Sequence, residues 1–402
     1  SYAVNIPFND DYYIFLGSVI NFLDAHTLKE KFDIFFSQHN EHRPALARAA
    51  SIACYYLKGK VDFNLLIYFG NLGLIGLAAV LYMLSESRKD RLLYLVPASF
   101  VLFHPQHWEN TQWAASSIQV FCGIAFSLLS IHMAANKGRK YLTLSVVFAI
   151  AATFTHAMGL FVLPVCLLVV VYQRRHRDAL PWLLLMAMVL IFYFTGYERP
   201  GHHPVIWDAL FVNPGNTVRY FFALLGAPVA VTGKASLIYA LGVASLSAMV
   251  FLTARKYYAR NVRIYSALIF IFIVAVVITL SRSGFGVEQA FSSRYRMIPL
   301  LIAALECIAV MELLGAEKAR RYFPILLVLT LLFNIGAFLT ETKYMKMHRA
   351  GLVRGALEYK INGTVPVSEE DREFVKSIIV RAKELGIYDF PDSEKLKKWA
   401  EQ

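Results

Sequence analysis

The sequence has few charged residues and few long polar stretches. Of its 402 residues only 17% are Asp, Glu, Lys or Arg, whereas 57% are hydrophobic, and the mean hydropathy is +0.49. This apolar share is well above that of ordinary soluble chains, which excludes a soluble globular protein. Apolar runs recur from Val61 onward, many of them close to the roughly 17 to 25 residues that cross a bilayer. We therefore expect an all-α polytopic membrane protein, since lipid leaves no other open structure.

Cysteine is also scarce. The four cysteines are Cys54, Cys122, Cys166 and Cys307, and the last three lie inside apolar runs. No CxxC pair occurs, so the pattern indicates neither a disulfide framework nor a cysteine metal site. We interpret all four as packing residues.

The net charge of +12 does not indicate nucleic-acid binding, because the basic residues follow the alternation of the loops. They cluster in every second loop, at residues 88–91, 137–140, 174–177, 255–263 and 318–321. The intervening loops hold only Arg199, Arg282, Arg294 and Arg296. The positive-inside rule places the first set in the cytoplasm and the second on the outer, periplasmic or lumenal face.

Ten apolar segments are expected to cross the membrane as helices. They are residues 61–84, 92–103, 114–134, 141–154, 158–172, 179–196, 235–254, 264–281, 297–314 and 323–341. Residues 217–231 are apolar too, but this run is short and contains Gly226 and Pro228. We expect it to be re-entrant or interfacial, which keeps residues 1–60 and the C-terminal tail on the outer face.

Three regions follow from this pattern. Residues 1–60 form a polar outer loop with two interfacial helices, residues 61–341 form the transmembrane bundle, and residues 342–402 form a small soluble helical domain on the outer face. That domain is compatible with a packing lid and with substrate recognition. The chain begins with Ser1 and shows no signal peptide, so we expect a further N-terminal piece, such as an eleventh membrane helix.

An acidic pair, Asp10 and Asp11, lies at the start of the outer loop. Adjacent carboxylates repel, so one of them tends to have a raised pKa, which suits a general base or a cation ligand. The same pair is also compatible with a solvated turn and a helix N-cap.

Further along this loop, Glu41, His42 and Arg43 precede Pro44. An arginine in this setting can bind phosphate oxygens bidentately, with histidine at the remaining oxygens. An ordinary polar loop closed by proline explains the pattern equally well.

The outer loop "HPQHWENTQWA" contains no basic residue other than histidine. His104, His107 and Trp108 are compatible with a sugar site, and Trp108 is equally compatible with an anchor at the membrane interface. The histidines are spaced i, i+3, but Pro105 interrupts the helix that would align them on zinc, so no metal site is predicted.

Arg282, Arg294 and Arg296 flank the loop "SRSGFGVEQAFSSRYR". Arginines on the outer side oppose the topology rule, so they indicate a local anion. The candidates are a phosphate, lipid headgroups, or Asp10 and Asp11. Because the strand, Lys and Ser/Thr of a P-loop are missing, the glycines do not form one.

Taken together, the acidic pair in "FNDDYY", the interfacial helices, the outward-facing polar residues and the C-terminal domain resemble the GT-C superfamily of membrane glycosyltransferases. The segment "FFSQHNEHRPALAR" is similar to one in bacterial members that decorate surface polysaccharides. The resemblance implies an enzyme of the bacterial inner membrane whose site faces the periplasm. It also implies a polyprenyl-phosphate sugar donor, a glycan or glycolipid acceptor, inverting transfer to a hydroxyl, and Asp10 or Asp11 as base. Members differ in their need for a divalent cation, and the sequence leaves that need open.

Two other functions stay open. A secondary transporter or flippase of lipid-linked sugars would place polar residues near the membrane midplane, often in repeated halves. No internal repeat is evident, and Glu306 is the one clearly intramembrane acid. An O-antigen polymerase or ligase would share the outward-facing chemistry and differ in whether the donor carries a chain.

Overall fold

The computed structural model describes residues 2–86, 90–201 and 203–400, so residues 88 and 89 of the first expected basic loop lie outside the described residues. The described residues form helices and no strand. Their one β-type pairing is an isolated bridge between His39 and His42. The all-α prediction is confirmed.

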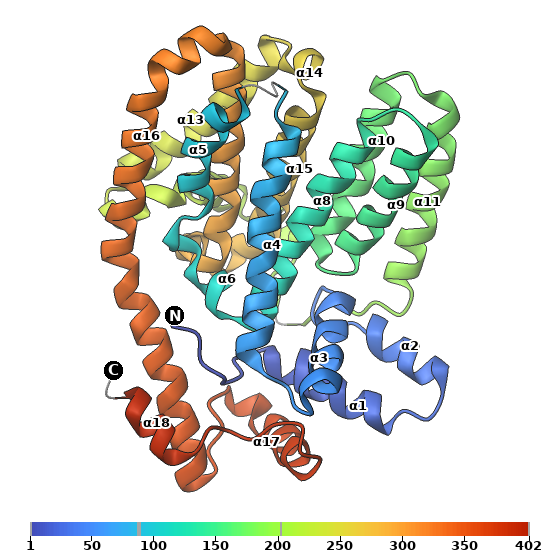
Figure 1. Ribbon diagram of the computed structural model, residues 1–402, viewed down its shortest axis with the longest axis vertical. Coiled ribbons are helices and arrows are strands. Elements are labelled where there is room, and N and C mark those ends of the chain that lie inside the picture. The colour runs from blue at the N-terminus through green and yellow to red at the C-terminus, as the bar shows by residue number, and fades with distance from the viewer. Residues whose placement is uncertain (1, 87–89, 202, 401–402) are drawn as a thin grey trace.

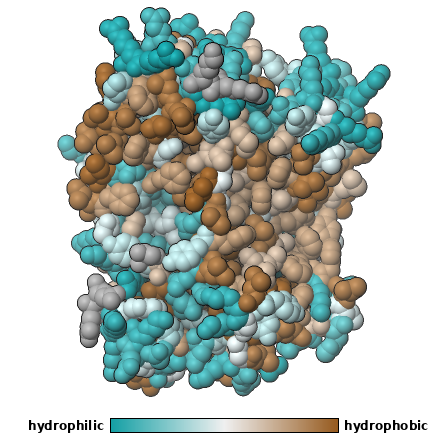
Figure 2. Space-filling view, in the orientation of Figure 1, coloured by the Kyte–Doolittle hydropathy of each residue, from teal (hydrophilic) through white to brown (hydrophobic). Residues whose placement is uncertain are grey.

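Polar surface lies at the two ends of the molecule, and an apolar band lies between them (Figure 2). The N-terminal helices and both chain ends lie at one end, which we call the terminal end (Figure 1). The opposite end, which we call the basic end, holds α14 and the bend of α16. Two polar ends around an apolar band are the arrangement expected of a bundle that crosses a bilayer.

Six helical segments of the described chain are long and apolar enough to cross a membrane, which indicates an integral membrane protein. They are α4 (Phe63–Leu84), the continuous α7 (Ala114–Ser116), η3 (Ser117–Cys122) and α8 (Gly123–Ala134), α11 (His176–Phe194), α13 (Ala235–Ala254), α15 (Val262–Arg282) with η7 (Ser283–Phe285), and α16 (Ser293–Asn362).

The other expected spans are also helical but shorter, or lie within α16. They are α5 (Arg91–Leu102), α9 (Arg139–Thr153), and η4 (Ala157–Phe161) with α10 (Val162–Tyr172). Helix α16 contains both of the last two expected spans and bends between them at Gly315, where φ is 77°. A positive φ is accessible to glycine without a steric cost, so Gly315 allows the chain to reverse at the basic end. Whether all ten segments cross the bilayer stays a prediction.

The expected re-entrant segment forms α12 (Pro214–Gly226) and η6 (Ala227–Thr232). Near its start, Asn216 donates a hydrogen bond to the carbonyl of Ser283, and at its end the carbonyl of Pro228 accepts one from Gln106. The two partners lie in the short helices η7 and η2 (Pro105–His107), which is compatible with the expected re-entrant course, and that course stays a prediction. It packs so closely on α13 that a Cβ at Gly226 would lie 1.9 Å from the Ile238 carbonyl oxygen.

Shorter elements connect the spans at both ends of the bundle. They are η2 (Pro105–His107), α6 (Trp108–Gln112), η5 (Asp208–Val212), α14 (Tyr257–Arg260) and η8 (Val287–Phe291).

The N-terminal region and the C-terminal tail form one unit at the terminal end. Its helices are η1 (Tyr12–Gly17), α1 (Ser18–Asp24), α2 (Leu28–Phe36), α3 (Ala45–Lys58), α17 (Glu369–Glu384) and α18 (Ser393–Ala400). Both regions contribute to one hydrophobic core, to which Phe15, Ile52 and Ile379 belong. The backbone N–H of Val61 also donates a hydrogen bond to the carbonyl of Ile387. Because α16 continues unbroken from the bundle into this unit, the boundary expected at residue 342 falls inside a helix.

At the basic end, one carboxylate joins three helices. Glu312 of α16 is 1% exposed and accepts hydrogen bonds from Ser85, the backbone N–H of Glu86, Tyr257 and Asn261. These donors come from the end of α4 and from α14 and the start of α15, so Glu312 fixes the loop ends against α16.

We expect Glu312→Ala to lower the free energy of unfolding by about 3 kcal/mol, because it leaves several buried donors unsatisfied. Thermal unfolding of the full chain in detergent measures this change. The matched control is Glu317→Ala, which removes an exposed carboxylate from the same helix. Equal melting temperatures for the two variants would contradict the expectation.

Candidate functional site

One large cavity opens at the terminal end, and we call it the main cavity. Its volume is about 1110 Å³, slightly above the usual range of small-molecule sites. Toward the bundle it is lined by apolar residues, which include Val120, Leu160, Phe161, Val274, Val277, Ile278 and Ile298. Its polar lining includes Asn9, Asp10, Tyr13, Asn40, Glu41, His42, His156, Arg199, His203, Arg282, Arg294, Ser368 and Asp371. An amphipathic substrate matches such a lining.

A tight turn delivers the polar residues of the first outer loop. The backbones of His39 and His42 bond to each other in both directions, at 2.8 and 2.9 Å. Asn40, between them, has φ of 50°, a conformation that asparagine tolerates better than most residues. The two residues at the tip, Asn40 and Glu41, therefore project into the main cavity.

Asp10 lines the main cavity, and 34% of its side chain is exposed. Its Oδ1 lies 3.1 Å from Nε2 of His39. A carboxylate accepts hydrogen bonds only, so His39 donates from Nε2 and holds one oxygen in place. The other oxygen is left available to a substrate, which is the geometry a general base needs.

Asp11 points the other way and is 2% exposed. Its Oδ2 accepts from the backbone N–H of Phe8, and its Oδ1 accepts from Trp113 Nε1 and the backbone N–H of Ala115, all at 3.0 Å. Burial raises the pKa of Asp11 to about 8, although these donors favour the charged form. A pKa near neutrality would suit a base, but Asp11 does not line the main cavity. It joins the N-terminal region to the bundle.

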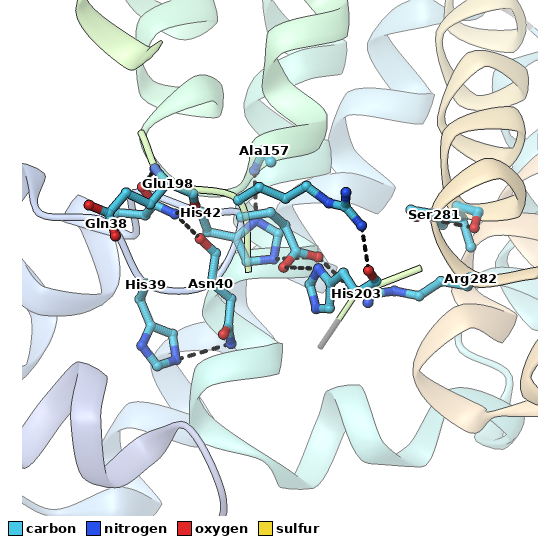
Figure 3. A network of polar contacts seen from close by, with 12 residues as sticks. Gln38, His39, Asn40, His42, Ala157, Glu198, His203, Ser281 and Arg282 are labelled. Carbon is cyan, nitrogen blue, oxygen red and sulfur yellow. Dashed lines mark hydrogen bonds and ion pairs between the residues drawn. The ribbon is translucent and has the colours of Figure 1, made fainter. Parts of the chain in front are cut away.

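Glu41 lies close to His42, His203 and Arg282, and these three residues are labelled in the network of polar contacts in Figure 3. Glu41 pairs with Arg282 at the end of α15, and its Oε2 lies 3.6 Å from Nδ1 of His203. His42 Nε2 lies 3.8 Å from the same carboxylate. Burial alone would raise the pKa of Glu41, but nearby cationic groups, Arg282 among them, outweigh it, so this pKa lies below its usual range. Glu41 is therefore an ionised partner that orients Arg282.

The ring of His42 packs at a tilt against that of His156, which directly precedes η4, with ring centroids 4.0 Å apart. Each Nδ1 accepts a backbone N–H, from Ala157 onto His42 and from Met158 onto His156. Each neutral ring therefore carries its hydrogen on Nε2. Burial lowers the pKa of both rings, which keeps the pair uncharged near neutral pH.

We expect acidification to destabilise the protein through this pair. A histidine whose folded pKa is depressed binds fewer protons folded than unfolded, so its stability contribution is lost as the pH falls below the unfolded pKa of about 6.5. The melting temperature should fall between about pH 7.5 and pH 5. His156→Gln, which cannot titrate, should show a smaller fall, whereas replacing exposed His26 by Gln should leave the slope unchanged. Identical slopes for the wild type and His156→Gln would contradict this.

Arg294 lines the main cavity from the first turn of α16. Its guanidinium lies over the ring of Tyr295, 5.1 Å from the centroid, and its Nε is buried without a hydrogen-bond partner. In the part of the chain that the structure describes, no carboxylate pairs with it. The carboxylate nearby, Glu109, instead accepts from the backbone N–H of Arg294 and from Ser293. Arg294 is thus an uncompensated cation in a concave site.

The structure brings five of the expected site residues to the main cavity: Asp10, Glu41, His42, Arg282 and Arg294. The other six lie elsewhere in the fold: Asp11, Arg43, His104, His107, Trp108 and Arg296.

Arg43 donates to the carbonyls of Phe36, Tyr193 and Thr195, so it caps the ends of α2 and α11. Arg296 pairs with Glu341 at 2.7 Å and joins the two arms of α16.

The three expected residues of the loop at 104–114 also pack away from the main cavity. His104 stacks on Phe333, His107 bonds to the carbonyl of Leu102 and Trp108 packs on His348.

The sequence did not single out Arg199, His203, Tyr13 or Asp371, which also line the main cavity. Tyr13 donates to Asp371 of the tail at 2.7 Å. This contact joins residues 358 positions apart, so no local pattern indicates it. In the described ranges, no group of three or more His, Cys, Asp or Glu side chains is placed to hold a metal ion.

Comparison with known proteins gives no match. No protein family, no curated protein and no solved structure is similar enough to this chain to identify a relative.

Proposed function

We propose that this protein is an inverting glycosyltransferase of the GT-C type in a bacterial inner membrane. It transfers a sugar from a polyprenyl-phosphate donor to a hydroxyl of a glycan or glycolipid on the periplasmic face. Asp10 is the general base, and Arg294 and Arg282 bind the donor phosphate.

One observation carries the proposal: the main cavity combines an accessible carboxylate, three arginines and an apolar wall formed by the helices of the bundle. A polyprenyl-phosphate sugar has matching parts, namely a sugar, an anionic phosphate and an apolar chain. Apolar side chains solvate the chain, and guanidinium groups bind phosphate bidentately.

The reaction needs few groups. The acceptor oxygen attacks the anomeric carbon, and its proton passes to the carboxylate of Asp10. The bond between the anomeric carbon and the phosphate oxygen breaks, and the electron pair leaves with the phosphate. Because arginine stabilises that charge, no acid is needed to protonate the leaving group.

The test is transfer by the purified full chain with a panel of synthetic polyprenyl-phosphate hexoses, together with mass spectrometry of the surface glycan in the native host. We expect one sugar to be missing from the glycan when the protein is inactivated. An intact glycan, combined with movement of lipid-linked sugar across vesicle membranes, would overturn the proposal in favour of a flippase. Loss of whole repeat units instead of a single sugar would favour a polymerase or ligase.

A further inference from the structure

A second pocket of about 410 Å³ lies beside the main cavity, and we call it the outer pocket. It is formed by the helix η1–α1, by α2 with the segment after it, and by α17 of the tail. Its size lies within the range of small-molecule sites. Most of its lining residues can form hydrogen bonds, with Asn21, Asp33 and Arg48 among them.

The main cavity and the outer pocket adjoin near Asp10, the proposed general base. Tyr13 lines both of them. Asp10 lines the main cavity and His39 lines the outer pocket, and their Oδ1 and Nε2 atoms are 3.1 Å apart. The Asp10–His39 pair therefore lies between the main cavity and the outer pocket.

The outer pocket has unused hydrogen-bonding capacity. Arg48 is 4% exposed and donates from one terminal nitrogen to the carbonyls of Phe35 and Ser37. Its Nε is buried without a partner in the described chain. Asn21 and Asp33 are exposed, and their side chains form no hydrogen bond or ion pair with other described residues. A buried donor without a partner is costly, which favours a ligand that bonds to it.

One wall of the outer pocket is aromatic. The rings of Tyr13 and Phe374 stack with centroids 5.5 Å apart and planes inclined by 21°. Phe374 lies on the highly charged helix α17, and 57% of it is exposed. An aromatic face next to amide, carboxylate and guanidinium groups is complementary to a sugar, which has both C–H faces and hydroxyls.

We propose that the outer pocket binds the saccharide acceptor. The acceptor enters from the aqueous side between α2 and α17, while the lipid-linked donor occupies the main cavity. This assignment rests on the proposed function. The acceptor hydroxyl attacks the anomeric carbon and gives its proton to Asp10, whose other oxygen is held by His39. The polyprenyl phosphate leaves with the electrons of the broken bond.

The test is saccharide binding by the full chain in nanodiscs. Saturation-transfer NMR with a panel of methyl glycosides and neutral oligosaccharides identifies a bound saccharide. We expect Asn21→Ala and Asp33→Ala each to weaken its binding by roughly tenfold, the effect of losing one good hydrogen bond. The matched control is Glu373→Ala on exposed α17, outside the outer pocket, which should bind like the wild type. Asp10→Asn should also keep its binding.

Unchanged binding in both pocket variants, or no binding of any panel member by the wild type, would overturn the assignment. Retention of polyprenyl phosphate by the same samples is measured in parallel and reports on the donor site alone. A chain that retains polyprenyl phosphate but binds no saccharide overturns the acceptor pocket and leaves the proposed function standing. A chain that binds saccharide in the outer pocket but retains no polyprenyl phosphate overturns the proposed function instead.

Discussion

Replacing Asp10 by Asn is expected to lower sugar transfer by about 10²- to 10⁴-fold, the usual contribution of a general base. Asparagine has nearly the same shape, and its side-chain oxygen can still accept from His39. Its amide cannot take up the acceptor proton. The melting temperature should stay near that of the wild type, because the Asp10 side chain is partly exposed and pairs only with His39 among the residues that the structure describes. Transfer by the purified chain and the surface glycan of cells at matched expression both measure the loss.

The matched control is Asp11→Asn, one residue further along. In the wild type, the backbone N–H of Phe8 donates to Oδ2 of Asp11. The asparagine would place its NH₂ group there, so two hydrogen-bond donors would face each other. We expect a loss of about 1 to 3 kcal/mol of stability and less folded protein, but normal transfer per folded molecule. If Asp11→Asn folds normally and is inactive while Asp10→Asn transfers sugar, the roles of the two carboxylates are reversed.

Local chain chemistry made much of the fold predictable. Apolar runs of sufficient length indicated the helical segments, and α3 begins at Ala45, directly after Pro44, a residue type that is frequent at helix starts. Helix α2 was not expected, although a sequence signal for it exists. Thr27 and Glu30 form a capping box at its start, which a search for Ser or Thr followed three residues later by Glu would have found. A capping box involves residues within one helical turn, so it can be recognised from the sequence without knowledge of the fold.

The site was less predictable, because contacts with residues distant in the sequence determine which side chains face the main cavity. Arg43 and Glu41 are two positions apart, yet Arg43 meets carbonyls of α11 while Glu41 meets Arg282. Nothing in the loop distinguishes an arginine that caps a helix from one that binds a ligand. The same holds for Arg294 and Arg296, which lie on opposite sides of one helical turn. Only the packing of α15, α16 and the tail decides which side chains face the cavity.

Arg294→Gln is expected to lower transfer by about 10²- to 10³-fold, as for removal of a donor that stabilises developing charge. Arg282 is paired with Glu41 and Arg296 with Glu341, whereas Arg294 has no carboxylate partner in the described part of the chain. Its charge in the first turn of α16 is also opposed by the helix dipole, which favours anions at that end. A cation kept at such a cost is best explained by an anionic ligand, and the phosphate of the proposed donor would be one.

The melting temperatures of the variants distinguish phosphate binding by Arg294 from a structural role of this residue. Arg294→Gln removes an uncompensated charge, so the melting temperature should be unchanged or higher, while retention of polyprenyl phosphate falls and Arg294→Lys restores part of it. Arg296→Gln leaves the nearly buried Glu341 unpaired, so it should lose about 3 to 5 kcal/mol of stability and retain the lipid when folded. Full transfer by Arg294→Gln would contradict the assignment. A variant that loses both activity and stability would show that Arg294 holds the bundle together, and the phosphate would then have to be bound by Arg282 after its release from Glu41.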